Sequence, residues 1–217
     1  MSDDEILASP MFIDLSSNSE GSSSSTLTPD EMIIIAKRYL IASNGLGGDP
    51  DMLADNFTFE GPVVGPLRKD EFVQAIGSVD FAAAFPDWKA EFYGFHVDPF
   101  EVNSNCPRVW YTARGRGVNK GPLVPFVPEE KGTGREVVNP PQVCSITIDP
   151  ESKLITRYTI GYVVDRTVGN TGGLGGLYGT LYSLGRPLPF PEAQPWKKSW
   201  QYTLFQKVGG LLNSLPK

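Results

Sequence analysis

The order of the local patterns limits the fold of this chain more than any single motif, because helical segments come first and long strands follow. Thr28-Pro29-Asp30-Glu31 is a capping box with proline at the first helical position. Residues 32–43 are apolar almost all round, which predicts a helix buried beneath other elements. We expect this helix to end at the glycines of residues 44–48.

The patterns in the remaining chain predict two further helical segments and then a series of strands. The helical segments are expected at residues 50–54 and 69–84, with a brief strand at 57–60 between them. Alternation of apolar and polar residues predicts four longer strands, at residues 88–97, 108–117, 142–148 and 154–165. This order is typical of an α+β domain with helices on one face of an antiparallel sheet.

Composition divides the chain into three parts. Residues 1–27 are rich in serine and acidic residues and cannot bury enough apolar surface to order themselves, so we expect a disordered tail. Residues 28–185 are expected to form one domain. Residues 186–217 begin with closely spaced prolines, and we expect an extended arm that ends in a short helix and wraps the domain.

The charge and the hydropathy of the chain disfavour nucleic acids and membranes as partners. The chain of 217 residues carries a net charge of −6, which disfavours binding to a nucleic acid backbone or an anionic membrane surface. It contains no run of 18 apolar residues, so membrane insertion is not expected. The acidic start, residues 1–5, is unlike a targeting peptide and favours a cytoplasmic location, although a processed organelle form would look the same. Cys106 and Cys144 are expected to be free thiols, with a single disulfide as the alternative.

Three motifs, in order and at matching intervals over about residues 29–180, carry a resemblance to a known family. They are Phe85-Pro86-Asp87-Trp88, then Gly132-Thr133-Gly134-Arg135-Glu136-Val137, then Tyr162-Val163-Val164-Asp165 before a glycine-rich stretch. The chain resembles the SnoaL-like polyketide cyclase branch of the nuclear transport factor 2-like superfamily. The resemblance implies a cone-shaped, curved antiparallel sheet closed by N-terminal helices around one apolar pocket, and a homodimer.

Two departures separate the chain from the cyclases of that family. Those cyclases usually carry Gly-Thr-His on the second long strand, where this chain has Thr112-Ala113-Arg114. The aromatic residue often found four residues before the acid/base aspartate is replaced by Gly161. Many members of the superfamily are not enzymes, so the resemblance supports the fold more strongly than the chemistry.

Asp165 is the first catalytic candidate, because it lies at the end of an apolar strand. A carboxylate that faces an apolar pocket has a raised pKa and can act as a base near neutral pH; the alternative is an aspartate that caps the following turn. His96, the one histidine, is the second candidate if its strand has no bulge, with a structural or surface role as the alternative. A lone histidine without Cys-x-x-Cys predicts no metal site, and no cofactor is expected.

Aromatic residues supply the candidate ligand-binding surface, and plain core packing is their alternative role. The candidates are Tyr39, Phe59, Phe85, Trp88, Phe92, Trp110, Tyr158 and Tyr162. Arg114 shares a strand face with Trp110, so it would bind a carboxylate or an oxyanion if that face lines the pocket and would be solvated if it does not.

Three functions remain open at this point. The chain is a cofactor-free isomerase or cyclase that acts on a small hydrophobic carbonyl compound through Asp165, a non-catalytic module that binds such a ligand, or an assembly module that dimerises through the exposed sheet face. The direction of the Asp165 side chain discriminates between them, because a carboxylate that points to solvent leaves the enzyme without its base.

Overall fold

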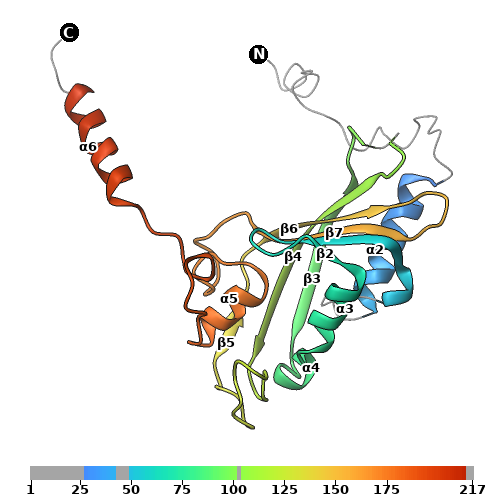
Figure 1. Cartoon of the computed structure of the whole chain (residues 1–217), viewed down its shortest axis with the longest axis horizontal. Coiled ribbons are helices and arrows are strands. Elements are labelled where there is room, and N and C mark those ends of the chain that lie inside the picture. The colour runs from blue at the N-terminus through green and yellow to red at the C-terminus, as the bar shows by residue number, and fades with distance from the viewer. Residues whose placement is uncertain (1–26, 43–48, 102–103, 214–217) are drawn as a thin grey trace, which may run out of the picture.

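The computed structural model describes residues 27–42, 49–101 and 104–213, so most of the expected tail and the helix-ending glycines lie outside the described residues. Within these ranges seven strands form one curved sheet in the order β2-β1-β7-β6-β4-β3, with β5 paired to β4 (Figure 1). The strands are β1 (Leu53–Glu60), β2 (Leu67–Arg68), β3 (Lys89–Val97), β4 (Arg108–Val118), β5 (Glu136–Val138), β6 (Gln142–Ile148) and β7 (Ile155–Val163).

The first helix begins at the capping box, as the sequence predicts. Thr28 Oγ1 accepts a hydrogen bond from Glu31 N at 3.3 Å, and Glu31 Oε2 accepts one from Thr28 N at 2.8 Å. The single helix expected at residues 69–84 is two helices, because the chain turns at Ser78 and restarts with Asp80 as the cap. The helical elements are α2 (Pro29–Ile41), η2 (Pro50–Met52), α3 (Lys69–Gly77), α4 (Phe81–Ala84), α5 (Gly176–Ser183), η3 (Pro191–Ala193) and α6 (Trp200–Asn213).

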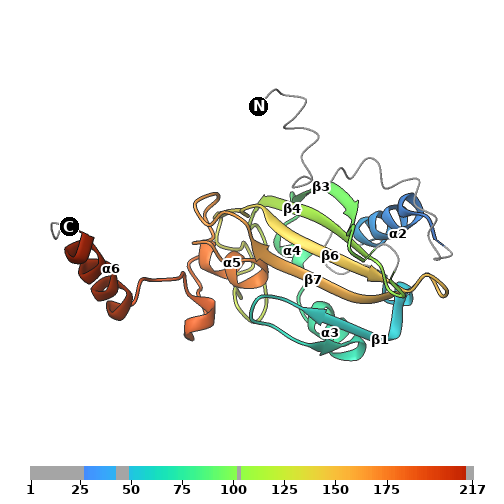
Figure 2. The same cartoon turned by 90° about the horizontal axis from the view of Figure 1, so that it is seen from above.

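The structure confirms an α+β fold in which a curved sheet is closed on one face by helices (Figure 2). One pairing differs from the antiparallel sheet that we expected: β1 runs parallel to β7, with Phe59 opposite Tyr158. The chain leaves β1 through β2 and the helices, re-enters the sheet at the far edge with β3, and returns to β1 with its last strand. The sheet is therefore mixed.

Two apolar clusters lie between the sheet and its helices. The larger one packs α2 and α3 against alternate residues of the strands, including Phe57, Val109 and Ile146. The smaller one lies toward β5 and α5 and includes Phe85, Leu123 and Leu181. On β4 the odd-numbered residues from Val109 face the helices, and the even-numbered residues from Arg108 face away. We call these the inner face and the outer face of the sheet.

The C-terminal arm does not wrap the domain as expected. Arg166 lies over the ring of Trp196 at 4.7 Å and fixes the base of the arm, but α6 stands away from the sheet (Figures 1 and 2). Trp200 on α6 is 72 % exposed. No helix in the described part of the chain combines the length and the apolarity that crossing a membrane requires.

Candidate functional site

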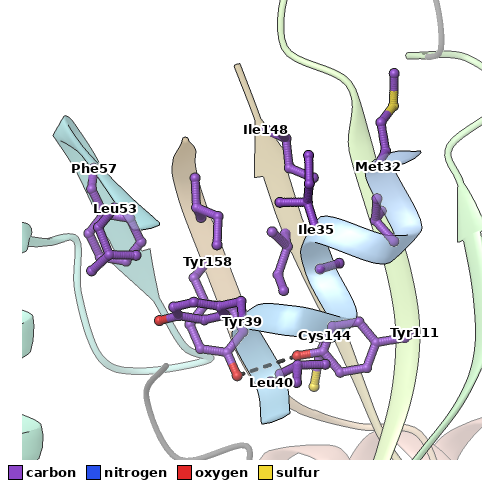
Figure 3. Close-up of a cluster of buried hydrophobic side chains, with 14 of the residues drawn as sticks. Met32, Ile35, Tyr39, Leu40, Leu53, Phe57, Tyr111, Cys144, Ile148 and Tyr158 are labelled. Carbon is purple, nitrogen blue, oxygen red and sulfur yellow. Dashed lines mark hydrogen bonds between the residues drawn. The ribbon is translucent and has the colours of Figure 1, made fainter. Parts of the chain in front are cut away.

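Three tyrosines meet in the middle of the inner face, where α2 crosses the sheet (Figure 3). Helix α2 supplies Tyr39, whose ring meets the ring of Tyr158 edge-on at a centroid distance of 5.5 Å. Strand β4 supplies Tyr111, whose hydroxyl donates a hydrogen bond of 3.3 Å to the hydroxyl of Tyr158 on β7. Cys144 of β6 lies between these strands. We call Tyr39, Tyr111, Tyr158 and Cys144 the tyrosine cluster.

The Tyr39 hydroxyl is the exception in this cluster, because it is buried and has no hydrogen-bond partner among the described residues. Tyr39 as a whole has 0 % of its surface exposed. A buried polar group without a partner costs about 1–3 kcal/mol, so native proteins keep few of them. This hydroxyl is therefore a donor that a bound oxygen atom could use.

The cluster can donate protons in hydrogen bonds, but it offers no base at neutral pH. Burial raises the pKa of Tyr39, of Tyr111 and of Tyr158 above the ordinary tyrosine value. Burial also raises the pKa of the Cys144 thiol to about 12. All four groups therefore stay neutral and protonated, which suits them to hold an oxygen acceptor.

Three half-buried phenylalanines connect this cluster with solvent, and we call Phe59, Phe92 and Phe95 the aromatic rim. Phe95 stacks on Tyr111 at 5.0 Å, and Phe92 meets the same ring edge-on at 5.9 Å. Phe59 meets Tyr158 edge-on at 5.9 Å. The rim gives the inner face an apolar, partly exposed border directly beside the buried hydroxyls.

The expected ligand-binding residues separate into three groups. Four of them, Tyr39, Phe59, Phe92 and Tyr158, gather on the inner face. Phe85 and Trp88 lie in the smaller apolar cluster, where their rings are 5.5 Å apart and Trp88 covers Gly115 and Gly117, so they serve the core. Trp110, Arg114 and Tyr162 lie on the outer face.

Asp165 does not face an apolar interior. Its carboxylate is exposed and accepts hydrogen bonds from Thr167 N at 2.8 Å and from Thr167 Oγ1 at 2.6 Å. These hydrogen bonds lower the pKa of Asp165, which is the opposite of the shift that a general base would need. The alternative role, an aspartate that caps the turn after its strand, is the one that the structure supports.

His96 also points away from the inner face, because β3 contains a bulge. Gly94 has a φ of 69°, and the register with β4 shifts between Tyr93 and His96. His96 therefore pairs with Trp110 on the outer face, and its Nδ1 lies 2.9 Å from the carbonyl oxygen of Gly94.

A second bulge, on β7, moves Tyr162 to the outer face. Gly161 has a φ of 88°, and the register between β6 and β7 shifts there, so Tyr162 pairs with Val143. Tyr162 is 42 % exposed. Gly161 is the residue that stands where the resemblance leads us to expect an aromatic side chain. It therefore also changes the direction of the end of β7.

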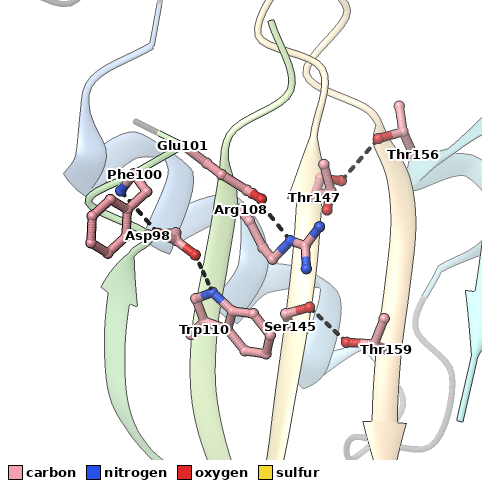
Figure 4. A network of polar contacts seen from close by, with 9 residues as sticks. All are labelled: Asp98, Phe100, Glu101, Arg108, Trp110, Ser145, Thr147, Thr156 and Thr159. Carbon is pink, nitrogen blue, oxygen red and sulfur yellow. Dashed lines mark hydrogen bonds and ion pairs between the residues drawn. The ribbon is translucent and has the colours of Figure 1, made fainter. Parts of the chain in front are cut away.

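The outer face carries two open hollows of about 370 and 470 Å³. The first is lined by Gly94, His96, Asp98, Pro99, Phe100, Trp110, Tyr111, Thr112 and Val143. The second is lined by Asn56, Thr58, Glu101, Ser104, Cys106, Arg108, Thr147, Thr156 and Arg157. Each hollow has its own polar contact, Trp110 Nε1 to Asp98 Oδ2 at 2.8 Å in the first and Arg108 Nε to Glu101 Oε2 at 3.2 Å in the second (Figure 4). Arg108 also lies over the ring of Trp110 at 5.3 Å, which connects the two hollows.

Sequence reasoning missed Tyr111 and Cys144, which belong to the tyrosine cluster. Tyr111 alternates with Trp110 on β4, whereas Trp110 and Arg114, which we expected to bind ligand on this strand, both lie on the outer face. Cys106 and Cys144 are both free, as expected. Among the described residues, no three His, Cys, Asp or Glu side chains gather as metal ligands would.

No model of a protein family matches the chain, and no curated protein matches it. Solved structures similar to it include AclR, a candidate hydroxylase from Streptomyces galilaeus, with a TM-score of 0.48 and 13% identity over 86% of this chain and 96% of that one. A candidate SnoaL-like polyketide cyclase from Jannaschia sp. CCS1 has a TM-score of 0.43 and 14% identity over 61% and 85%. The pinacolase BvnE from Penicillium brevicompactum has a TM-score of 0.42 and 12% identity over 60% and 84%.

Proposed function

We propose that this chain binds a small hydrophobic compound with a hydrogen-bond-accepting oxygen, such as a carbonyl, at the tyrosine cluster. The observation that carries the proposal is the Tyr39 hydroxyl, which is buried without a partner. A ligand oxygen would accept its hydrogen bond and remove the cost of leaving it unpaired. The apolar remainder of the ligand would pack against the rim.

The rim supplies the route to the hydroxyls. Phe59 and Phe92 are half-buried and border the tyrosines, so a rotation of either ring would admit a flat apolar molecule. Mostly apolar walls with a few polar groups that fix orientation are typical of small-molecule sites.

Binding without turnover is the function that this geometry supports best. A cofactor-free isomerase or cyclase could use the same hydroxyls to polarise a carbonyl, but proton abstraction needs a base within reach of the ligand. Asp165 is exposed and bound to Thr167, and the tyrosine hydroxyls and the Cys144 thiol keep their protons at neutral pH. An isomerase or cyclase at this site would therefore require a proton acceptor other than Asp165, the tyrosine hydroxyls and the Cys144 thiol.

The test is mass spectrometry of ligand that co-purifies with the native protein, followed by titration with a panel of small aromatic ketones. We expect Tyr39→Phe to weaken binding of a retained ketone about tenfold, since it removes one buried hydrogen bond. Tyr162→Phe is the matched control, because it removes a hydroxyl from the outer face. Equal affinity in Tyr39→Phe and the native chain would remove the basis of the proposal, and turnover of a ketone would favour the isomerase.

We also propose that two copies pair through the outer face of the sheet. Tyr93 and Tyr162 are 48 % and 42 % exposed there, and a second copy would cover them. The outer face also holds Thr147 Oγ1, which is buried without a partner among the described residues and lines the second hollow.

The cytoplasmic location stays a prediction from the sequence.

A further inference from the structure

The acidic net charge of the chain conceals a basic C-terminal segment. Residues 193–217 contain four lysines and no aspartate or glutamate, so this segment carries +4. Since the whole chain carries −6, residues 1–192 carry −10. Net charge therefore disfavours contact with an anionic membrane surface for residues 1–192 and not for residues 193–217.

Helix α6 of this segment is amphipathic, and the described residues of the domain leave its apolar side exposed. Trp200, Leu204 and Val208 follow one another at intervals of four, which places them on one face, and Phe205 adjoins them. Trp200 and Phe205 are 72 % and 73 % exposed. The hydroxyl of Ser199 caps the helix by accepting a hydrogen bond from Tyr202 N at 3.1 Å, so the helix has a defined start away from the sheet.

The lysines and aromatic side chains of α6 have the arrangement that is typical of helices that lie on a lipid surface. Lys197 and Lys198 are exposed directly before the helix, and Lys207, seven residues after Trp200, lies at the border between the apolar side and Thr203. Amphipathic helices that lie in a membrane interface combine lysines on the polar side with Trp, Phe and Leu on the other. Trp and Tyr side chains are enriched at the level of the lipid headgroups.

We propose that α6 anchors the protein to an anionic lipid surface, lying in the headgroup region with Trp200, Leu204, Phe205 and Val208 toward the acyl chains. Lys197, Lys198 and Lys207 contact the lipid phosphates and carboxylates. One surface then meets both needs of the helix, because it offers negative charge next to apolar chains. The acidic remainder is repelled by the same surface, and the proline-rich stretch before α6 keeps it at a distance.

The test is flotation of the full chain with phosphatidylcholine vesicles that contain one quarter phosphatidylserine, compared with pure phosphatidylcholine vesicles. We expect binding to the anionic vesicles, a blue shift of tryptophan fluorescence, and weaker binding as salt is added. Replacing Lys197 and Lys198 by Gln should weaken binding about thirtyfold, about fivefold for each lysine. The matched control replaces Lys89 and Lys131, both exposed on the body, by Gln and should bind as the native chain does.

A second pair of variants tests the apolar face. Trp200→Ser with Phe205→Ser should abolish flotation, whereas Thr203→Ala with Gln206→Ala on the polar side should preserve it. Absence of flotation by the native chain at low salt would overturn the proposal. A second result would also overturn it. If the native chain sediments as an assembly without lipid, and only the Trp200/Phe205 variant dissociates that assembly, then α6 binds a second copy of the chain.

Discussion

Tyr111 donates a hydrogen bond of 3.3 Å to Tyr158 across the inner face of the sheet, next to the unpaired hydroxyl of Tyr39. The two paired residues lie on β4 and β7, which both flank β6. Three tyrosines of similar burial thus differ in one respect, whether the hydroxyl has a partner.

That difference predicts opposite effects of the same substitution on stability. Tyr111→Phe breaks a buried hydrogen bond and should destabilise the protein by about 1–2 kcal/mol, whereas Tyr39→Phe removes an unpaired hydroxyl and should be neutral or stabilise by about 1 kcal/mol. Urea unfolding of the ligand-free variants measures both. Equal losses in the two variants would mean that the Tyr39 hydroxyl has a partner in solution.

Asp165→Asn should leave ligand binding unchanged, because the exposed carboxylate binds only the turn at Thr167 among the described contacts. A small loss of thermal stability is expected, since the amide is a weaker acceptor than the carboxylate. Isothermal titration with the ketone retained by the native chain provides the measurement. A tenfold loss of affinity would show that Asp165 reaches the ligand in solution.

Gly115→Ala should destabilise the protein by about 1–3 kcal/mol, because the new methyl group would overlap the indole of Trp88. Gly77→Ala is the control: nothing lies within 4 Å of its new methyl group, and alanine favours a helix by about 1 kcal/mol. In differential scanning calorimetry, the unfolding temperature should fall for Gly115→Ala and rise for Gly77→Ala. A stable Gly115→Ala variant would indicate that Trp88 is displaced in solution.

Acid should destabilise the fold through several carboxyl groups. Hydrogen bonds to Thr28 lower the pKa of Glu31, and a hydrogen bond to Lys120 lowers the pKa of Asp87. Each depressed pKa contributes stability above the unfolded value, 4.5 for Glu and 3.8 for Asp, and that stability is lost as the pH falls through the lower folded value. Thermal unfolding between about pH 6 and 3 measures the decline. Asp87→Asn should flatten it, and an unchanged slope would contradict the assigned pKa shift.

The proposed pairing through the outer face predicts a dimer in sedimentation velocity at micromolar concentration. Replacing Tyr93 and Tyr162 by Glu should give a folded monomer, because four like charges would face one another across the two-fold axis. Ile34→Glu, on the exposed side of α2, adds charge outside the outer face and should leave the dimer intact. A native chain that sediments as a monomer would refute the pairing.

Local patterns predicted the elements well where capping and alternation were strong. The capping box at Thr28 places the start of α2, and alternation from Gln142 gives β6 at its observed bounds. The direction of β1 relative to β7 was not predictable, because periodicity states which face a residue occupies but carries no information on parallel or antiparallel pairing.

The candidate site was predicted in part, and two glycines explain most of the difference. A residue inserted in a strand reverses the faces that follow it, so the bulges at Gly94 and Gly161 turned His96 and Tyr162 to the outer face. A glycine within a strand is a known sign of a bulge, and this signal was present in the sequence. The unpaired state of Tyr39 depends on how α2 crosses the sheet, which no local pattern encodes.

The parallel pairing of β1 with β7 has a consequence for the growing chain. The ribosome releases β1 about a hundred residues before its partner, so the edge of β1 that β7 later covers stays open while nearly half of the chain is synthesised. Contacts of such wide separation form slowly, since the long intervening loop has to close first. The nascent protein therefore leaves the exit tunnel with an open strand edge, which is prone to pair with other chains until β7 covers it.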